Sequence, residues 1–238
     1  MPDRIAHRGI IVGVDGSPWA NMAVRWAAHE AAMRGAALTL VHVLAAPVAS
    51  RMGWALSTAP LPADFGGWQQ DEQARQLVED AIKIVQDSTQ DSGPLQVNSE
   101  VLSPGEVFSS AVPTLVHLTK EAQMIVVGSR GQGAFARGLL GSASFGLVHH
   151  AHCPVAVIHD EAAPLELLEA PVLVGIDGSP ASELATAIAF DEASWRGVDL
   201  VALHAWSEVI VPDFPGVNLV RDSIRGGKDS GRAARRLA

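Results

Sequence analysis

Apolar residues follow two alternating patterns along the first 160 positions of this chain. Short, mainly apolar runs rich in β-branched residues predict strands that are buried on both faces, as in parallel sheets. These runs are 10–14, 38–43, 124–128 and 154–158, and 95–101 alternates like a partly exposed strand. Apolar residues at helical spacing occupy the segments between them, namely 18–34, 69–90, 105–121 and 142–151. Such alternation of strand and helix predicts an α/β fold with an open parallel sheet and right-handed crossovers.

The opening of this pattern returns later in the chain at an offset of 162. Segment 12–18 reappears as 174–180 with six of seven residues identical. Further repeated residues are Glu30, Arg34, Gly35, Leu38 and His42, which correspond to Glu192, Arg196, Gly197, Leu200 and His204. We therefore expect a complete domain at 1–160, a linker at 161–171, and a partial second copy at 172–238 with a disordered basic tail from 225. A truncated, a frame-shifted and a naturally short second copy would all produce this pattern.

An acidic turn follows the first predicted strand. Asp15 and Gly16 end that strand, and Ser17-Pro18 places a capping hydroxyl before a proline at the first helical position. Asp15 is thus expected at the carboxyl end of a central strand, where open α/β sheets bind ligands. The alternative is a plain turn with a helix cap. We favour that structural interpretation for the repeat of this residue, Asp177, because its own copy contains no glycine-rich phosphate loop.

A glycine-rich stretch follows the most apolar run, 124–128. Directly behind this predicted strand, the spacing G-x2-G-x9-G-S is formed by Gly128, Gly131, Gly141 and Ser142. A strand that leads through glycines into a helix start directs backbone N–H groups and the positive end of a helix dipole at one spot, which suits a phosphate chain. The sequence GxxxxGK[ST], typical of P-loops, does not occur in the chain. The alternative is ordinary turn punctuation, which the pairing with Asp15 disfavours.

Together, the acidic turn, the glycine spacing and the repeat resemble the universal stress protein family, in its ATP-binding branch and in the tandem form common in mycobacteria. The resemblance implies a Rossmann-like, five-stranded sheet with strand order 3-2-1-4-5. It also implies ATP as the ligand. Arg130 and Arg137 could neutralise part of the phosphate charge, and a divalent ion such as Mg²⁺ could neutralise the rest. Asp15 would lie by the nucleoside, the Val41 backbone would meet the adenine edge, and the glycine loop would surround ribose and phosphates. The implied binding residues are Gly13, Asp15, Val41, Gly128, Ser129, Arg130, Gly131, Gln132, Gly133, Ala134, Gly141, Ser142 and Ala143.

Composition and charge exclude several other classes of protein. With 48% hydrophobic and 18% charged residues over 238 positions, the chain has the balance of a globular protein with a sizeable core. Its formal net charge of -9 disfavours nonspecific binding to nucleic acid or to anionic membranes. The single cysteine, Cys153, leaves no intrachain disulfide and no multi-cysteine metal site. Neither a signal peptide nor an apolar span of about 20 residues is found, so we expect a cytoplasmic protein.

The expected function is regulation of a stress or dormancy response through nucleotide occupancy and partner contacts. No general base or nucleophile accompanies the glycine loop, so no catalytic residue is assigned, and any ATP hydrolysis is expected to be weak. Two alternatives stay open: a slow ATPase or nucleotidyl transferase on the same fold, and a nucleotide-independent interaction module. No metal site is expected at His149, His150 and His152, because adjacent residues on a short helix point in different directions.

Self-association is expected through the last predicted strand of the first domain. The family resemblance implies pairing across this edge, here 154–158, and the partial second copy contains no counterpart of that strand. An apolar strand left unpaired at a sheet edge is a template for another chain. The simplest expected assembly is a homodimer through these strands.

Overall fold

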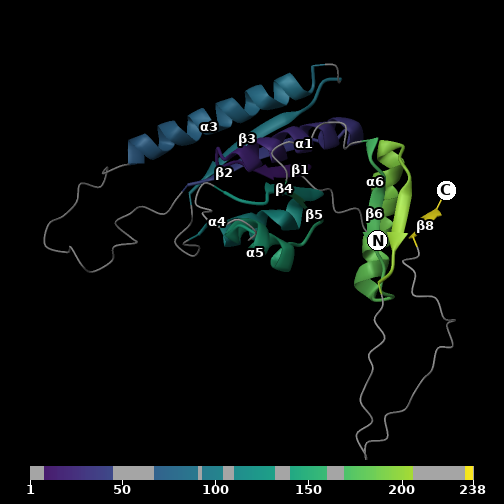
Figure 1. Ribbon diagram of the computed structural model, residues 1–238. Helices are drawn as coiled ribbons and strands as arrows, with labels where there is room; N and C mark the ends of the chain where they lie inside the picture. The colour runs from purple at the N-terminus through teal and green to yellow at the C-terminus, as the bar shows by residue number, and fades with distance from the viewer. Residues whose placement is uncertain are drawn as a thin grey trace, which may run out of the picture. The chain divides into compact units, whose positions relative to one another are not determined.

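The computed structural model describes residues 8–44, 67–90, 93–103, 110–131, 140–159, 169–205 and 234–237. Two compact units, Met1–Ala163 and Pro164–Ala238, make up the chain (Figure 1). In the first unit, five parallel strands form one sheet in the order β3-β2-β1-β4-β5. The predicted α/β class and the strand order 3-2-1-4-5 are thereby confirmed.

Strands and helices alternate along the first unit. Its strands are β1 (Ile10–Gly13), β2 (Leu38–Val43), β3 (Val97–Leu102), β4 (Met124–Gly128) and β5 (Val155–Ile158). Its helices are α1 (Pro18–Arg34), α3 (Gly67–Ser88), α4 (Ala111–Leu118), the 3₁₀ turn η1 (Thr119–Glu121) and α5 (Ser142–His150). The helical prediction for 105–121 thus corresponds to α4 followed directly by η1, and residues 104–109 lie outside the described ranges.

Two apolar clusters cover the two faces of this sheet. Alternate strand residues point to opposite faces, so Ile10 and Val12 pack with α1 and α3, whereas Ile11 packs with α4 and α5. Figure 1 shows α1 and α3 on one side of the strands and α4 and α5 on the other. All five residues of β4 are buried. Because helices cover both faces, the central strands appear in the sequence as apolar runs rather than as alternation.

The start of α1 is fixed by local capping and by its small buried residues. Ser17 Oγ accepts a hydrogen bond from Ala20 N at 3.2 Å, and Pro18 occupies the first helical position. At the other end, Gly35 stops the helix in the left-handed conformation, with φ 61°. The buried face of α1 consists largely of alanines, which let the helix approach β1 and β4 closely. The turn that contains Asp15 is therefore held at the carboxyl ends of these two strands.

The second unit repeats the opening of the first. It contains β6 (Val172–Gly175), α6 (Pro180–Arg196), β7 (Leu200–Leu203) and β8 (Ala234–Leu237), in the sheet order β6-β7-β8. β6 and β7 are parallel, as β1 and β2 are, whereas β8 is antiparallel to β7. The prediction that residues 225–238 form a disordered tail is wrong for Ala234–Leu237. These four residues pair with the β7 edge, whose backbone N–H and C=O groups would otherwise lack ladder partners.

Candidate functional site

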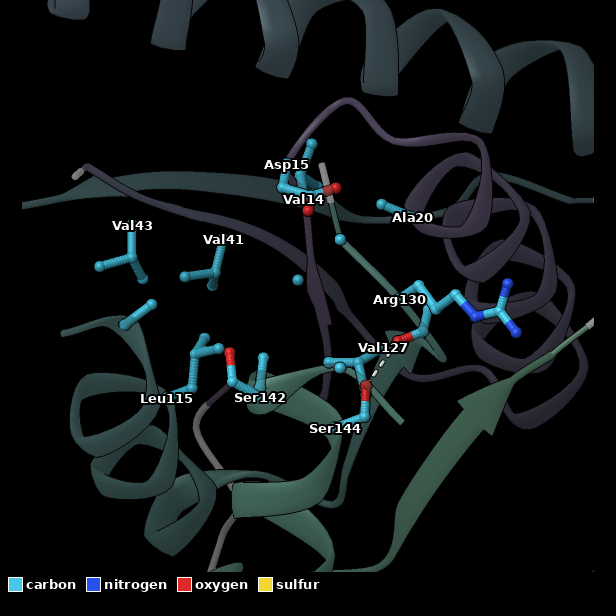
Figure 2. Close-up of a pocket in the computed structure, with 16 residues that line it drawn as sticks. Val14, Asp15, Ala20, Val41, Val43, Leu115, Val127, Arg130, Ser142 and Ser144 are labelled. Atoms are coloured by element: carbon cyan, nitrogen blue, oxygen red, sulfur yellow. Dashed lines mark hydrogen bonds between the residues drawn. The ribbon is translucent and has the colours of Figure 1, made fainter. Parts of the chain in front are cut away.

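A cavity of about 240 Å³ opens at the carboxyl ends of β1, β2 and β4 (Figure 2). Apolar side chains of β2 and α4, including Val41, Val43 and Leu115, line one part of it, and Figure 2 shows them together at one end. Asp15 and the glycine-rich turn after β4 line the other part. The cavity thus joins an apolar wall to a wall of backbone and polar groups.

Hydrogen bonds to both neighbouring segments hold the acidic turn in place. Asp15 Oδ1 accepts a hydrogen bond from Ser17 N at 2.9 Å. Just before it, Val14 N donates to Val41 O at 2.8 Å. His42 Nδ1 lies 2.7 Å from Val14 O, and because a carbonyl can only accept, this ring nitrogen carries the proton. The backbone that leads into Asp15 is therefore anchored to β2 through both its N–H and its C=O.

Glycines at the end of β4 and in the turn that follows it allow two strand-to-helix turns to touch. A Cβ at position 131 would lie 2.5 Å from Asp15 Oδ2, and one at position 128 would lie 2.6 Å from the carbonyl carbon of Trp19. Both separations are shorter than real Cβ contacts. Position 128 requires glycine because the obstacle is backbone, whereas at position 131 the obstacle is the end of the Asp15 side chain. Gly141 N donates to Ser129 O at 2.7 Å, which ties the far end of the loop back to β4. The result is a cradle of backbone beside the Asp15 carboxylate.

The structure brings most of the sequence-predicted site residues to this cavity. Those that line it are Gly13, Asp15, Val41, Gly128, Arg130, Gly131, Gly141, Ser142 and Ala143. Ser129 does not line it, because this residue is buried behind the turn and its carbonyl accepts from Gly141 N. The predictions for Gln132, Gly133 and Ala134 fall outside the described residues.

Sequence reasoning missed most of the apolar wall. The additional lining residues are Val14, Ala20, Val43, Ala111, Leu115, Val127 and Ser144. Val43 could have been found, because residues two apart on a strand face the same way and Val43 follows Val41 at that spacing. The Val41 carbonyl already accepts a hydrogen bond from Val14 N, and the pairing of β1 with β2 ends at Gly13 and Val41. Backbone groups of alternate strand residues point to the same side, so the next N–H and C=O of β2 on the β1 side belong to Val43. Leu115 carries no comparable signal, because its helix reaches the site only through tertiary packing.

Among the described residues that line the cavity, Arg130 is the one cation. Its guanidinium lies 5.5 Å from the centroid of the Trp19 ring, and its carbonyl accepts from Ser17 Oγ at 3.4 Å. Figure 2 shows the side chain directed away from Val41 and Val43. Positive charge therefore lies at the glycine end of the cavity, stacked on the first turn of α1.

The second unit reproduces the acidic turn without this cradle. Ser179 N donates to Asp177 Oδ1 at 2.9 Å, as Ser17 does to Asp15, and hydrogen bonds from Ser179 lower the pKa of the Asp177 carboxyl. Asp177 is exposed, and a Cβ at Gly175 or Gly178 would meet no atom within 4 Å. The described part of this unit thus offers no glycine turn opposite the acid.

The described residues contain no cluster of three or more His, Cys, Asp or Glu side chains that could hold a metal ion. None of the helices in these ranges is long and apolar enough to cross a membrane.

Comparisons with known proteins show which family and fold this chain is similar to. The sequence profile of the universal stress protein family matches residues 7–159 and 170–220. The universal stress protein Rv2623 of Mycobacterium tuberculosis (strain H37Rv) is 53% identical over 211 residues, which cover 88% of this chain and 67% of that protein. A universal stress protein crystal structure from Archaeoglobus fulgidus has the same fold, with a TM-score of 0.63 at 16% identity over 84% of this chain and 68% of its own. Another universal stress protein was solved in complex with cAMP, with a TM-score of 0.44 at 22% identity over 64% of this chain and 96% of its own.

Proposed function

This chain belongs to the universal stress protein family, and from that premise we propose that its first unit binds one molecule of ATP. The bound nucleotide would regulate a stress or dormancy response by changing which partners the protein contacts. One observation carries the proposal: a single cavity combines an apolar wall with a glycine cradle beside a carboxylate. An adenine nucleotide has the same division into an apolar base and a charged phosphate chain.

Each part of the cavity suits one part of the nucleotide. The adenine ring would pack against Val41, Val43 and Leu115, and its polar edge would meet the Val43 backbone, because the Val41 carbonyl is already engaged. Asp15 would accept hydrogen bonds from the ribose hydroxyls. The family resemblance assigned the adenine edge to the Val41 backbone. The proposed arrangement places it at Val43, two residues further along β2.

The phosphates would bind at the start of α5. Gly141 N is occupied by Ser129 O, so among the described residues the first N–H groups of α5, from Ser142 onward, and the Ser142 hydroxyl would donate to phosphate there. The positive end of the helix dipole adds to their attraction for an anion.

A divalent ion such as Mg²⁺ fits this donor set only together with the nucleotide. Asp15 is the one carboxylate among the described residues that line the cavity, so phosphate oxygens and water would have to supply the remaining oxygen ligands. The ion would neutralise phosphate charge at this position. We therefore expect Mg²⁺ to strengthen ATP binding and to bind weakly by itself.

Identification of the ligand tests the proposal directly. Mass spectrometry of small molecules released from the purified, denatured protein should detect an adenine nucleotide. Titration calorimetry of the nucleotide-free protein with ATP, ADP, AMP, cAMP and GTP should give one site per chain and the tightest binding for ATP. Two equivalent sites, or no measurable binding of any adenine nucleotide, would contradict the proposal.

Binding without appreciable turnover is part of this proposal. The described lining of the cavity presents a single carboxylate, and Asp15 Oδ1 already accepts from Ser17 N, which ties this carboxylate to the turn and not to an attacking water. We expect hydrolysis well below about 1 per second, the low end of ordinary enzyme rates. A faster rate that disappears in Gly131→Val would instead favour the ATPase alternative. Since ATP is an intracellular metabolite, the proposed ligand also implies a cytoplasmic protein.

We propose the β5 edge as the site of homodimer formation. The two edges of the five-stranded sheet differ, because β3 exposes Asn98 and Ser99, whereas β5 has the apolar sequence VAVI. The carbonyls of Pro154 and Ile158 face β4, because they accept hydrogen bonds from Ile125 N and Ser129 N. Backbone groups alternate in direction along a strand, so those of Val157 point away from β4, toward the open edge. Val157→Pro should therefore dissociate the dimer in sedimentation experiments and leave ATP binding unchanged. A monomeric wild-type protein at tens of micromolar would contradict this assignment.

The proposed domain boundaries remain 1–160 for the binding domain, 161–171 for the linker and 172–238 for the partial second copy. All described residues that line the cavity precede position 160. A fragment that ends near residue 160 should therefore bind ATP with the affinity of the full chain. A large loss of affinity in that fragment would show that the second copy contributes to the site.

A further inference from the structure

We propose that Trp19 is a positioning residue of the phosphate-binding turn and that it acts through Arg130. This inference rests on the proposed nucleotide function of the cavity. Sequence reasoning gave Arg130 a direct role in neutralising phosphate and gave no role to Trp19. The structure instead joins the two side chains, one from the first turn of α1 and one from the glycine turn after β4.

Two contacts and one close approach connect Trp19 and its neighbour Ser17 to the turn. The Arg130 guanidinium lies 5.5 Å from the Trp19 ring centroid, which is within cation–π range. Ser17 Oγ donates to the Arg130 carbonyl at 3.4 Å, so the main chain of the same residue is also held by α1. At the root of the turn, a Cβ on Gly128 would lie 2.6 Å from the Trp19 carbonyl carbon and 2.8 Å from its Cβ. The turn is therefore attached to α1 at its root, its backbone and its side chain.

The internal repeat separates this role from the general capping of the helix. Asp177, Ser179 and Pro180 preserve the acidic turn and the cap of the second unit, with nearly the same hydrogen bonds as in the first. The counterpart of Trp19 at the offset of 162 is Ala181, which is exposed. A tryptophan is therefore not needed to form the turn or to start the helix. Trp19 occurs in the first unit, whose described residues include the glycine turn that contains Arg130.

The stacked arginine would preorganise the turn for phosphate. A long, flexible side chain held on an aromatic face loses fewer conformations when the ligand arrives, and a fixed turn keeps its N–H groups directed at one place. Cation–π pairs at partly exposed sites contribute little individually, and their loss corresponds to about a two- to fivefold change in an equilibrium constant. Removal of the tryptophan should therefore weaken ATP binding by about that factor.

A double-mutant cycle on the full chain tests this inference. ATP dissociation constants are measured by calorimetry for the wild type, Trp19→Leu, Arg130→Ala and the double variant, together with urea unfolding midpoints. Trp19→Leu should weaken binding about two- to fivefold, and the double variant should bind no more weakly than Arg130→Ala alone. Trp19→Phe should largely restore affinity, because it retains an aromatic face.

Trp26→Leu provides the matched control on the same helix. Trp26 packs against the apolar core and is not among the residues that line the cavity, so its replacement should lower stability without changing ATP affinity. Additive effects in the double variant, unchanged affinity in Trp19→Leu, or an equal affinity loss in Trp26→Leu would each overturn the inference. If the wild type itself binds no adenine nucleotide, the proposed function fails first, and that result is distinct from these three.

Discussion

Replacement of Gly131 by alanine is expected to weaken ATP binding while leaving the fold intact. The new Cβ would lie 2.5 Å from Asp15 Oδ2, almost an ångström closer than ordinary van der Waals contact allows. Apart from the carboxyl carbon of Asp15 at 3.8 Å, no other atom lies within 4 Å, so the strain falls on this carboxylate alone. Because a carboxyl group can rotate away, relief of the clash should move Asp15 off the ligand rather than unfold the turn.

The size of this effect follows from the interactions that Asp15 would lose. Hydrogen bonds to a charged group contribute about 1.5 to 3 kcal/mol, which corresponds to an affinity loss of about 10- to 150-fold. The free energy of unfolding should change by less than about 0.5 kcal/mol, as is usual for sites away from the core. Gly131→Val, with a branched side chain, should abolish detectable binding.

Calorimetric titration with ATP and urea denaturation of the same preparations measure the two quantities separately. Gly175→Ala is the control, because it alters a glycine at the end of β6, the counterpart of β1 in the second unit, where a Cβ meets no atom within 4 Å. Asp15→Asn should reproduce much of the affinity loss if the carboxylate is the group affected. The reasoning is refuted if Gly131→Ala binds ATP within twofold of the wild type while Asp15→Asn does not.

Three further predictions concern other parts of the chain. Gly128→Ala should lower the free energy of unfolding by about 1 to 3 kcal/mol, because its Cβ would collide with Trp19 backbone, which cannot rotate away. An unchanged midpoint in urea titrations would contradict this prediction. Asp177→Ala should leave ATP affinity and stoichiometry unchanged in calorimetry, since no glycine cradle faces it in the described residues; a lost site would place a ligand there. Burial raises the pKa of the Cys153 thiol from 9.0 to about 11. Iodoacetamide at pH 8 should therefore modify Cys153 about 100-fold more slowly in the native protein than in the unfolded chain. Equal rates would refute the burial of this thiol.

The sequence predicted the order and type of the elements because their signals are local. Strands covered on both faces must be apolar along their length, and capping residues such as Ser17 and Gly35 fix helix ends within one turn. The acidic turn and the glycine spacing could be placed together because parallel strands bring their carboxyl ends to one edge of the sheet. The repeat was equally visible, since it needs only a comparison of the chain with itself.

Tertiary structure decided the contacts that depend on side-chain direction and on segments distant in sequence. Leu115 joined the cavity through the packing of α4, and the hydrogen bond from Val14 N to Val41 O moved the proposed adenine edge to Val43. Only the fold showed Arg130 stacked on Trp19, because no spacing rule connects residues 19 and 130. For the same reason the pairing of β8 with β7 escaped prediction: a strand added to a sheet edge depends on the edge available to it, and its own four residues carry no apolar alternation.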